Sequence, residues 1–319
     1  MIKSTTCLYC KAEATNFQYE LTDIFGDNYS IVKCPVCNAH NLAPFPSEAQ
    51  LSKAYDETYY GAKEEKFEGI FEKAMDYFRF LRAKKIAKYM PSNGKILDIG
   101  CGNGRFLMSI NKAGNFNLFG IELAGNSAKR AARHSEINLK VGRLQKDNFE
   151  SETFDVITLF HVFEHLDNPS EILDIIDGII KKNGHLVMSF PNIGSNQSKR
   201  YKGNWLHLDP PRHLFFFENT DFIKIMESRG YELVKEDYFS TEQNPFGLIQ
   251  SQLNNWVKKR DLLFESLKGN SDYLKGYSKF KLMLQKMFFL LCFPYAICID
   301  FFESKCKEGA TVLYILKKK

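Results

Sequence analysis

The sequence predicts an α/β protein built on a doubly wound, mostly parallel β-sheet. The main observation is that short apolar runs, typical of buried strands, alternate with segments whose apolar residues recur at helical spacing. A second is that one apolar run, KILDIGCGNGRFL at 95–107, ends in alternating glycines and then begins a helix. Strands are expected at 95–100, 117–123, 139–142, 154–160, 185–190, 231–239 and 310–318, and helices at 67–90, 104–113, 125–135, 169–182 and 219–229.

The first strand and the turn after it predict a binding pocket. Gly100, Gly102 and Gly104 permit a tight turn and a close approach of the backbone to a ligand, and the following helix begins with free N–H groups. Glu122, at the end of the next strand, is placed to accept hydrogen bonds from ribose hydroxyls. Both a dinucleotide and S-adenosylmethionine use such a turn. The carboxylate of Asp98 favours the second ligand, because it attracts an ammonium group and would repel a pyrophosphate.

Size and composition limit the function classes. With 319 residues, of which 44% are hydrophobic and 14% aromatic, the chain can bury one large core and a small second one. The formal charge of +5 is mild and the basic residues are dispersed, so we expect no nucleic-acid partner. The opening MIKSTTCLYC lacks an apolar leader segment, so a cytoplasmic location and reduced cysteines are expected.

Two cysteine pairs define an N-terminal unit of about 45 residues. Cys7-x-x-Cys10 and Cys34-x-x-Cys37 each offer two thiolates across one tight turn, and four thiolates complete a tetrahedron. The pattern predicts a zinc ribbon whose closed site is structural, since it leaves no open position for water. His40 follows the second pair and is expected at the surface rather than on the metal.

The rest of the chain is expected to follow in consecutive parts. After the ribbon at 1–45, a linker and helical cap occupy 46–92, and the Rossmann-like domain fills 93–319. Residues 240–308 interrupt the strand–helix rhythm as a helical insertion before the last strand. That strand at 310–318 is expected to pair with 231–239 as an antiparallel hairpin at the sheet edge.

The insertion carries an unbroken apolar stretch at 287–299, with Pro294 in its middle. The stretch is too short to span a bilayer as a regular helix. Three interpretations stay open: a buried pair of lid helices, an oligomer interface, or peripheral contact with the inner face of the membrane through 283–302.

Chemical groups follow the fourth strand in the stretch FDVITLFHVFEHLDNP. His161, Glu164 and His165 come at the carboxyl end of the sheet, beside the glycine turn. An imidazole next to a carboxylate is suited to taking a proton from a hydroxyl near neutral pH. Two alternatives are a structural histidine that fixes the turn, and a divalent cation held by Glu164 and His165.

A second cluster lies in the long loop after the fifth strand. We expect Trp205, His207 and Arg212 to contact substrate, with His213 as a second candidate base. Arg212 can clamp a phosphate or carboxylate, and the alternative is that it pairs with Asp209 and only braces the loop.

These motifs together resemble the class I S-adenosylmethionine-dependent methyltransferases, especially the bacterial group that includes the ubiquinone-pathway O-methyltransferases. The resemblance rests on LDIGCGNG, Glu122, FDVITLFHVFEHLDNP and the GHLVMSFPN strand. It implies a seven-stranded sheet in the order 3-2-1-4-5-7-6 with a reversed last strand. Arg143 stands where many relatives carry an acid for the adenine amine, so that contact is expected at Leu144 or Asp147. The cofactor residues expected in full are Asp98, Gly100, Cys101, Gly102, Gly104, Glu122, Leu123, Leu144, Phe160 and His161.

The predicted reaction is transfer of a methyl group to a small-molecule or lipid- or nucleotide-linked acceptor, such as a sugar of surface-glycan or natural-product biosynthesis. His165, Glu164 and His213 are the predicted catalytic residues, and Tyr60 joins the substrate-binding set. Tyr59, Tyr60 and Phe160 are expected to shield the sulfonium. Alternatives are C-methylation of a keto-sugar, RNA methylation, a nicotinamide oxidoreductase, and a catalytically idle cofactor-binding partner protein. The sequence does not determine the oligomeric state.

Overall fold

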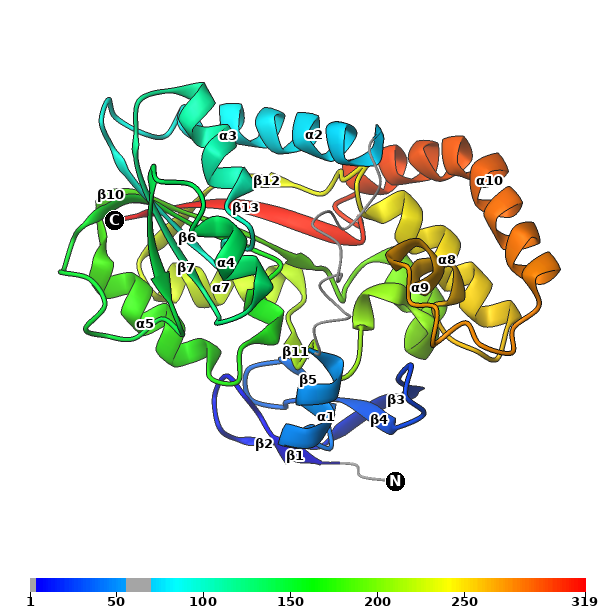
Figure 1. Cartoon of the computed structure of the whole chain (residues 1–319). Helices are drawn as coiled ribbons and strands as arrows, with labels where there is room; N and C mark the ends of the chain where they lie inside the picture. The colour runs from blue at the N-terminus through cyan, green and yellow to red at the C-terminus, as the bar shows by residue number, and fades with distance from the viewer. Residues whose placement is uncertain (1–3, 56–69) are drawn as a thin grey trace. The chain divides into compact units, whose positions relative to one another are not determined.

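The computed structural model describes residues 4–55 and 70–319 (Figure 1). It divides into two compact units, each made from several stretches of the chain. The ribbon unit comprises Met1–Lys66, Pro191–Phe222 and Asp237–Val312, and the sheet unit comprises Phe67–Phe190, Ile223–Glu236 and Leu313–Lys319. The predicted boundaries were consecutive, whereas the structure groups the N-terminal segment with the loop after the fifth strand and with most of the insertion. Tyr59, Tyr60 and the start of the helix predicted at 67–90 lie outside the described residues.

A seven-stranded sheet forms the centre of the sheet unit. Its order is β12-β13-β10-β9-β6-β7-β8, which confirms the predicted order 3-2-1-4-5-7-6. The pairs β6–β7, β6–β9, β7–β8 and β9–β10 are parallel. The strands are β6 (Lys95–Ile99), β7 (Asn117–Glu122), β8 (Ile137–Val141), β9 (Phe154–Phe160), β10 (Ile180–Pro191), β12 (Tyr231–Asp237) and β13 (Thr311–Lys318).

The last strand runs against its neighbours, as predicted. The N–H of Asn192, directly after β10, donates to the carbonyl of Ala310, directly before β13. At the other end, the N–H of Lys319 donates to the carbonyl of Gly230, directly before β12. Because β13 starts where β10 ends and ends where β12 starts, it is antiparallel to both.

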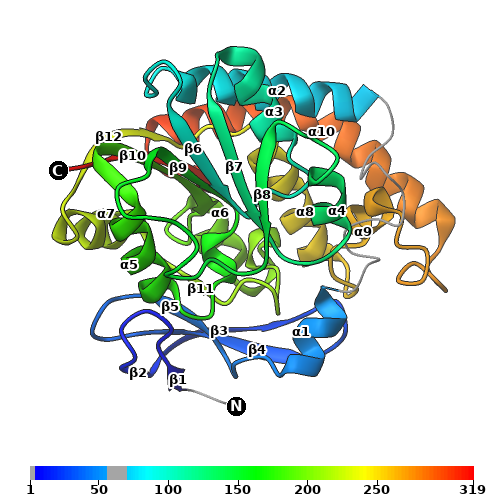
Figure 2. The same cartoon turned by 60° about the vertical axis from the view of Figure 1, so that its left-hand side comes forward.

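Helices cover both faces of this sheet (Figures 1 and 2). On one face, α2 and α3 pack their apolar sides on the central strands; α5 and α7 lie on the other face. The first core joins Ala83 and Ile86 of α2 and Leu107 and Ile110 of α3 to Ile96, Leu118 and Val156 of the strands. The helices are α2 (Ile70–Ala87), α3 (Arg105–Ala113), α4 (Asn126–Ala131), α5 (Pro169–Ile179) and α7 (Asn219–Ser228). The helix predicted at 169–182 ends early because Ile180 already pairs with Phe154 in the sheet.

The ribbon unit contains a four-stranded sheet with the order β11-β5-β4-β3. Its inner strand β5 pairs with β11, which the chain reaches only after 170 residues or so, so the ribbon is completed by a distant segment. The other elements here are β1 (Thr5–Thr6), β2 (Glu13–Ala14), β3 (Asn16–Thr22), β4 (Asn28–Lys33), β5 (His40–Ala43), α1 (Glu48–Ala54), α6 (Asn196–Tyr201) and β11 (Phe215–Phe216). His40 is 6% exposed, so its predicted place at the surface is wrong; β11 and the residues after it cover it.

The insertion folds into three helices, α8 (Asn244–Trp256), α9 (Leu262–Lys268) and α10 (Lys279–Lys305). An apolar cluster that includes Leu253 of α8 and Ala296 of α10 holds the long helix against α8. The helix pair predicted for this segment is therefore present, but α10 is not a buried lid: only 11% of its most apolar 18-residue window is buried. Among the described residues, α10 is the helix long and apolar enough to cross a membrane.

Candidate functional site: the glycine turn and the cysteine cluster

The glycine turn joins β6 to α3 in the left-handed conformations that the sequence predicts. Gly100, Gly102 and Gly104 have φ angles of 72°, 58° and 79°. The N–H groups of Gly100 and Cys101 both donate to the carbonyl of Ile121, at 2.8 and 3.1 Å, which ties the turn to β7. At the start of α3 the N–H of Arg105 donates to Asn103 Oδ1 at 3.3 Å, while Gly104 has no side chain to cap the N–H groups that follow, which leaves them to a ligand.

The three glycines serve different purposes. A Cβ added at Gly100 would collide with the side chain of Val162, and one at Gly104 would lie 2.7 Å from Ile137 Cδ1. A Cβ at Gly102 would meet no atom within 4 Å. Gly100 and Gly104 are thus required by packing, whereas Gly102 faces open space of the kind a cofactor fills. The turn therefore fits S-adenosylmethionine.

Glu122 closes one side of this space. Its Oε2 accepts a hydrogen bond from the N–H of Gly102 at 2.6 Å, and its Oε1 accepts one from Leu123 at 3.1 Å. Burial raises the pKa of Glu122, and the two N–H groups oppose that effect. A carboxylate has about four acceptor positions, so two are left for the ribose hydroxyls that the sequence assigns to this residue.

Asp98 lies inside the sheet, 3% exposed. One oxygen accepts a hydrogen bond from Thr158 Oγ1 of β9 at 2.6 Å. Burial raises the pKa of Asp98 to about 7. Because burial costs the charged form most, a nearby ammonium group would be the natural partner of this carboxylate.

His161, Glu164 and His165, which follow β9, lie in one short segment of the sheet unit. His161 has a φ of 53°, which is uncommon for a residue with a side chain and marks a site held by its surroundings. Its Nδ1 lies 3.3 Å from Oε1 of Glu164, which is 2% exposed, and its Nε2 lies 3.4 Å from Ser189 Oγ of β10. His165 ends the same short 3-10 turn, Phe163–His165, and is half-buried. The sequence predicts Glu164 and His165 as an imidazole–carboxylate pair, and the structure brings His161 to the same carboxylate as well.

The remaining residues predicted to contact the cofactor differ in their burial and in their neighbours. The ring of Phe160 meets Phe106 edge-on at 4.8 Å, and the Arg82 guanidinium lies 5.1 Å from its centre. The Cys101 thiol packs against Gly120 of β7, so this residue faces the turn through its backbone. Leu123 is exposed and Leu144 buried. Arg143, where an acid was expected, forms an ion pair with Asp167 at 2.7 Å.

The loop cluster lies in the ribbon unit and serves its core. Trp205 is fully buried with Tyr201, Leu208 and Phe216, so it packs this core and does not form part of an open binding surface. Arg212 is 3% exposed; it donates to both oxygens of Asp209 and to the carbonyl of Ala54. Burial opposes ionisation of Asp209, but the charges of Arg212 and His213 hold its pKa well below the usual value. The bracing alternative therefore describes the geometry of this pair.

The two histidines of that loop are joined through the backbone. His213 is 8% exposed, and its Nδ1 lies 2.8 Å from the carbonyl oxygen of His207. Its Nε2 lies 3.8 Å from Asp209. These two contacts orient the His213 ring, and the His207 ring meets Trp205 edge-on at 5.5 Å.

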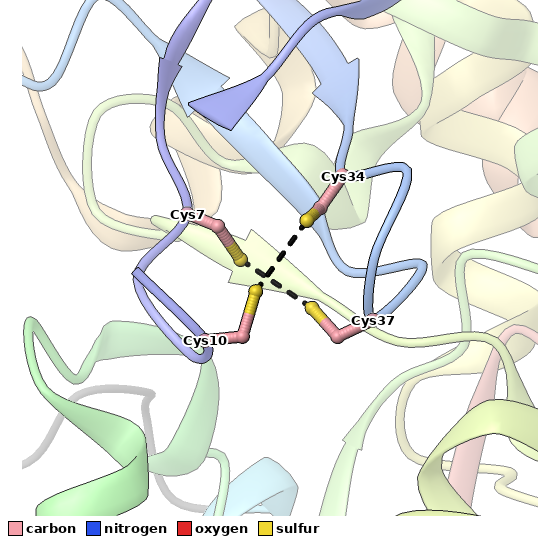
Figure 3. A group of neighbouring side chains, drawn as sticks. All are labelled: Cys7, Cys10, Cys34 and Cys37. Atoms are coloured by element: carbon pink, nitrogen blue, oxygen red, sulfur yellow. Dashed lines mark hydrogen bonds between the residues drawn. The ribbon is translucent and has the colours of Figure 1, made fainter. Parts of the chain in front are cut away.

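The four cysteines of the ribbon converge (Figure 3). Their sulfur atoms all lie within 4.8 Å of one another, and the pairs Cys7–Cys37 and Cys10–Cys34 are 3.5 Å apart. Tetrahedral zinc with Zn–S bonds of about 2.3 Å requires sulfur separations of about 3.8 Å, so the donor set fits a structural zinc ion.

The two cysteine loops have the same backbone design. The N–H of Cys7 donates to Ala12 and that of Cys34 to Ala39, both at 2.8 Å. The residue after each pair, Lys11 or Asn38, has a φ near 60° (62° and 61°). This repeated turn is what places both thiols of a pair on one side.

The structure adds residues that sequence analysis did not assign. Asn41 Nδ2 lies 3.7 Å from the Cys7 sulfur, a typical outer contact of a metal ligand. Thr158 holds Asp98, and Arg82 covers Phe160. The signal for Thr158 was a hydroxyl inside the apolar run FDVITLF; Arg82 carried no such signal, because it comes from a helix far from the motif.

A separate cavity of about 1160 Å³ lies within the ribbon unit. It is bordered by the β3–β4 hairpin, by Tyr201–Asn204, and by Lys258–Arg260 with Tyr273. None of the residues predicted for cofactor binding or catalysis lines it. It is therefore distinct from the glycine turn.

The family model described as "Methyltransferase domain" matches residues 70–236, slightly more than half of the chain. The chain belongs to this methyltransferase-domain family. The match covers the glycine turn, Glu122 and the residues after β9. It confirms the predicted resemblance to class I S-adenosylmethionine-dependent methyltransferases and agrees with the cofactor that the turn fits.

Relatives agree with this assignment. The chain is 27% identical over 128 residues to a mitochondrial ubiquinone biosynthesis O-methyltransferase of Dictyostelium discoideum, covering 34% of this chain and 40% of the relative. It is 32% identical over 108 residues to a ubiquinone biosynthesis O-methyltransferase of Glaesserella parasuis, covering 31% and 45%. The chain thus spans less than half the length of these curated relatives.

A solved structure shares the fold. It is a protein from Galdieria sulphuraria described as a sarcosine dimethylglycine methyltransferase, with a TM-score of 0.51 and 12% identity. The alignment covers 84% of this chain and 98% of that one. It confirms the Rossmann-like methyltransferase fold.

Proposed function

We propose that this methyltransferase-domain protein transfers the methyl group of S-adenosylmethionine to an oxygen of a hydroxylated small molecule, a sugar or a related metabolite of surface-glycan or natural-product biosynthesis. The observation that carries the proposal is the open space before Gly102, bordered by the Glu122 carboxylate and by the start of α3. The relatives named as O-methyltransferases support oxygen as the acceptor atom.

The main task of the chain in this reaction is alignment. The cofactor would supply a methyl group already activated by the positive charge of its sulfur. Glu122 would hold the ribose and Asp98 the ammonium end, which fixes the direction in which the methyl group points. Orientation of this kind can contribute up to roughly 7–11 kcal/mol in favourable cases. The apolar side chain of Phe160 would help to keep water away.

The acceptor hydroxyl must lose its proton as the new bond forms. We assign this proton to the imidazole of His165, which is half-buried and follows directly after Glu164. The buried carboxylate of Glu164 and the half-buried imidazole of His161 position the turn that carries it. Imidazole is suited to this step because its pKa lies near neutrality.

The base assignment is tested by separating turnover from cofactor binding. His165→Ala should lower kcat by about a hundredfold or more and leave the Kd for the cofactor within a few-fold of the parent. Calorimetry gives the Kd. Equal losses of turnover and affinity would show that His165 is structural. His161→Ala is the matched variant, and it should lower turnover and stability together because His161 holds a strained turn.

The acceptor is identified with an isotope. The protein is incubated with methyl-labelled S-adenosylmethionine and fractionated cell extract, and mass spectrometry searches for a labelled product. The ¹³C NMR shift of the labelled methyl separates an ether from a carbon-bound methyl group. A methyl label on carbon would instead support C-methylation, and a label in RNA would support RNA methylation. Tight cofactor binding with no labelled product would support a catalytically idle cofactor-binding protein.

A further inference from the structure

The long helix α10 carries a continuous apolar face toward solvent. Nine large apolar side chains on it are between 46% and 78% exposed. At 100° per residue their positions fall within an arc of about 140°, so they share one face of the helix over about 33 Å. We call this face the α10 stripe; it consists of Phe280, Met283, Leu284, Met287, Leu290, Leu291, Tyr295, Phe301 and Phe302.

The opposite face of α10 is fixed to the protein. Ala296, with Phe289 and Phe293 beside it, packs in the cluster shared with α8, as the side-by-side helices in Figure 1 show. The buried carboxylate of Asp300 accepts hydrogen bonds from Asn244 Nδ2 at 2.7 Å and from the N–H of Ser240 at 3.1 Å. A helix anchored in this way along one side presents its stripe outward. It is not free to cross a bilayer on its own.

Exposed lysines border the stripe, whereas the two acids of α10 are buried (Asp300) or half-buried (Glu303). Lys279, Lys281 and Lys286 are exposed along its first half, and Lys305 ends it. The acid Asp300 points to the other face, where it is 1% exposed. Trp256, at the end of α8, is 62% exposed and meets Phe288 of α10 at 5.0 Å, so it lies near the stripe.

We propose that the α10 stripe docks on an anionic lipid surface, with α10 lying in the plane of the headgroups. An apolar helix face with lysines along its borders is the pattern of interfacial helices, and exposed tryptophan and tyrosine favour the same region. A second copy of this chain is the less suitable occupant, because a two-fold contact would bring the same lysines against each other.

The test uses the full chain with its metal and vesicles of phosphatidylcholine, alone or mixed with phosphatidylglycerol. We expect co-sedimentation with the anionic vesicles that weakens as salt is raised. The chain has two tryptophans, and Trp205 is already fully buried. Vesicle binding should therefore shift the emission of Trp256 to shorter wavelength, and Trp256→Phe should abolish that shift.

Paired variants separate the stripe from net charge. Leu290→Glu with Leu291→Glu should lower vesicle binding by about tenfold or more, whereas Asn16→Glu with Gln18→Glu, which adds the same charge on exposed positions of β3, should change it little. Equal binding by both double variants would overturn the proposal. So would a wild-type dimer in lipid-free solution that Leu290→Glu with Leu291→Glu converts to monomer, or vesicle-bound protein that resists extraction by alkaline carbonate.

Discussion

The glycine turn of the sheet unit and the cysteine cluster of the ribbon unit are built in opposite ways. The backbone of the turn is built from residues 95–122: one strand, one loop and the end of the next strand carry Asp98, the glycines and Glu122, and the more distant Thr158 adds a hydrogen bond to Asp98. The ribbon closes through contacts far apart in the chain, such as Lys33 with Glu218 at 2.8 Å and Asn38 with Asp221 at 3.0 Å. A local motif therefore supplies the main groups of the cofactor site, whereas the ribbon sheet is completed by a distant segment of the chain and its thiols by a metal ion.

The largest expected effect follows from the metal. Cys34→Ser should remove the zinc, about one ion per chain, and unfold the ribbon unit, because structural zinc contributes roughly 10–16 kcal/mol in small zinc-binding domains. Metal analysis and limited proteolysis measure the loss. The exposed Cys298→Ser is the control and should keep the metal. If the ribbon unit stays folded without zinc, its fold does not depend on the metal, and the contrast with the sheet unit is lost.

The next effect compares two Arg–Asp pairs, one in each unit. Arg212→Gln breaks the buried pair with Asp209 and should lower the free energy of unfolding by about 3–5 kcal/mol. Arg143→Gln breaks the exposed pair with Asp167 and should cost less than about 1 kcal/mol. Denaturant titration measures both. Unchanged stability of the Arg212 variant, with a raised KM for the acceptor, would instead support the predicted substrate clamp.

A third comparison uses two glycines with similar backbone strain. Gly102→Ala and Gly269→Ala each place a side chain at positive φ with no atom within 4 Å of the new Cβ. Only Gly102 faces the proposed cofactor, so its variant should bind S-adenosylmethionine about a hundredfold more weakly, while Gly269→Ala should bind it normally. Calorimetry decides. Unchanged affinity in the Gly102 variant would move the cofactor away from the turn.

The smallest effect is the pH dependence of cofactor binding. Because burial raises the pKa of Asp98 to about 7, the carboxyl is mostly protonated at pH 6 and mostly ionised at pH 8. Affinity for the ammonium end should therefore rise about tenfold between these values. In the cofactor-free protein, stability should fall from about pH 4 to pH 7, because the unfolded chain releases this proton first. Asp98→Asn should remove the pH dependence of both cofactor affinity and stability. If the pH dependence persists in this variant, it belongs to another titrating group.

Much of the fold could be predicted because the spacing of apolar residues along the chain distinguishes strands from helices. The order of the seven strands, the reversed last strand and the convergence of Cys7, Cys10, Cys34 and Cys37 all agree with the sequence. Trp205 and Arg212 were harder to place. A polar or aromatic residue in a long loop has the same local pattern whether it lines a pocket or braces a core.

The sequence by itself determined the local features of this protein: the glycine turn, the acid at the end of the next strand, and the two cysteine knuckles. These depend on backbone conformations and short spacings that neighbouring residues impose. The tertiary structure alone decided that β11 completes the ribbon sheet, that the His161 imidazole lies against the Glu164 carboxylate, and that one face of α10 is left to solvent. Each of those outcomes depends on which distant segments exclude water from a side chain, and no local pattern records that.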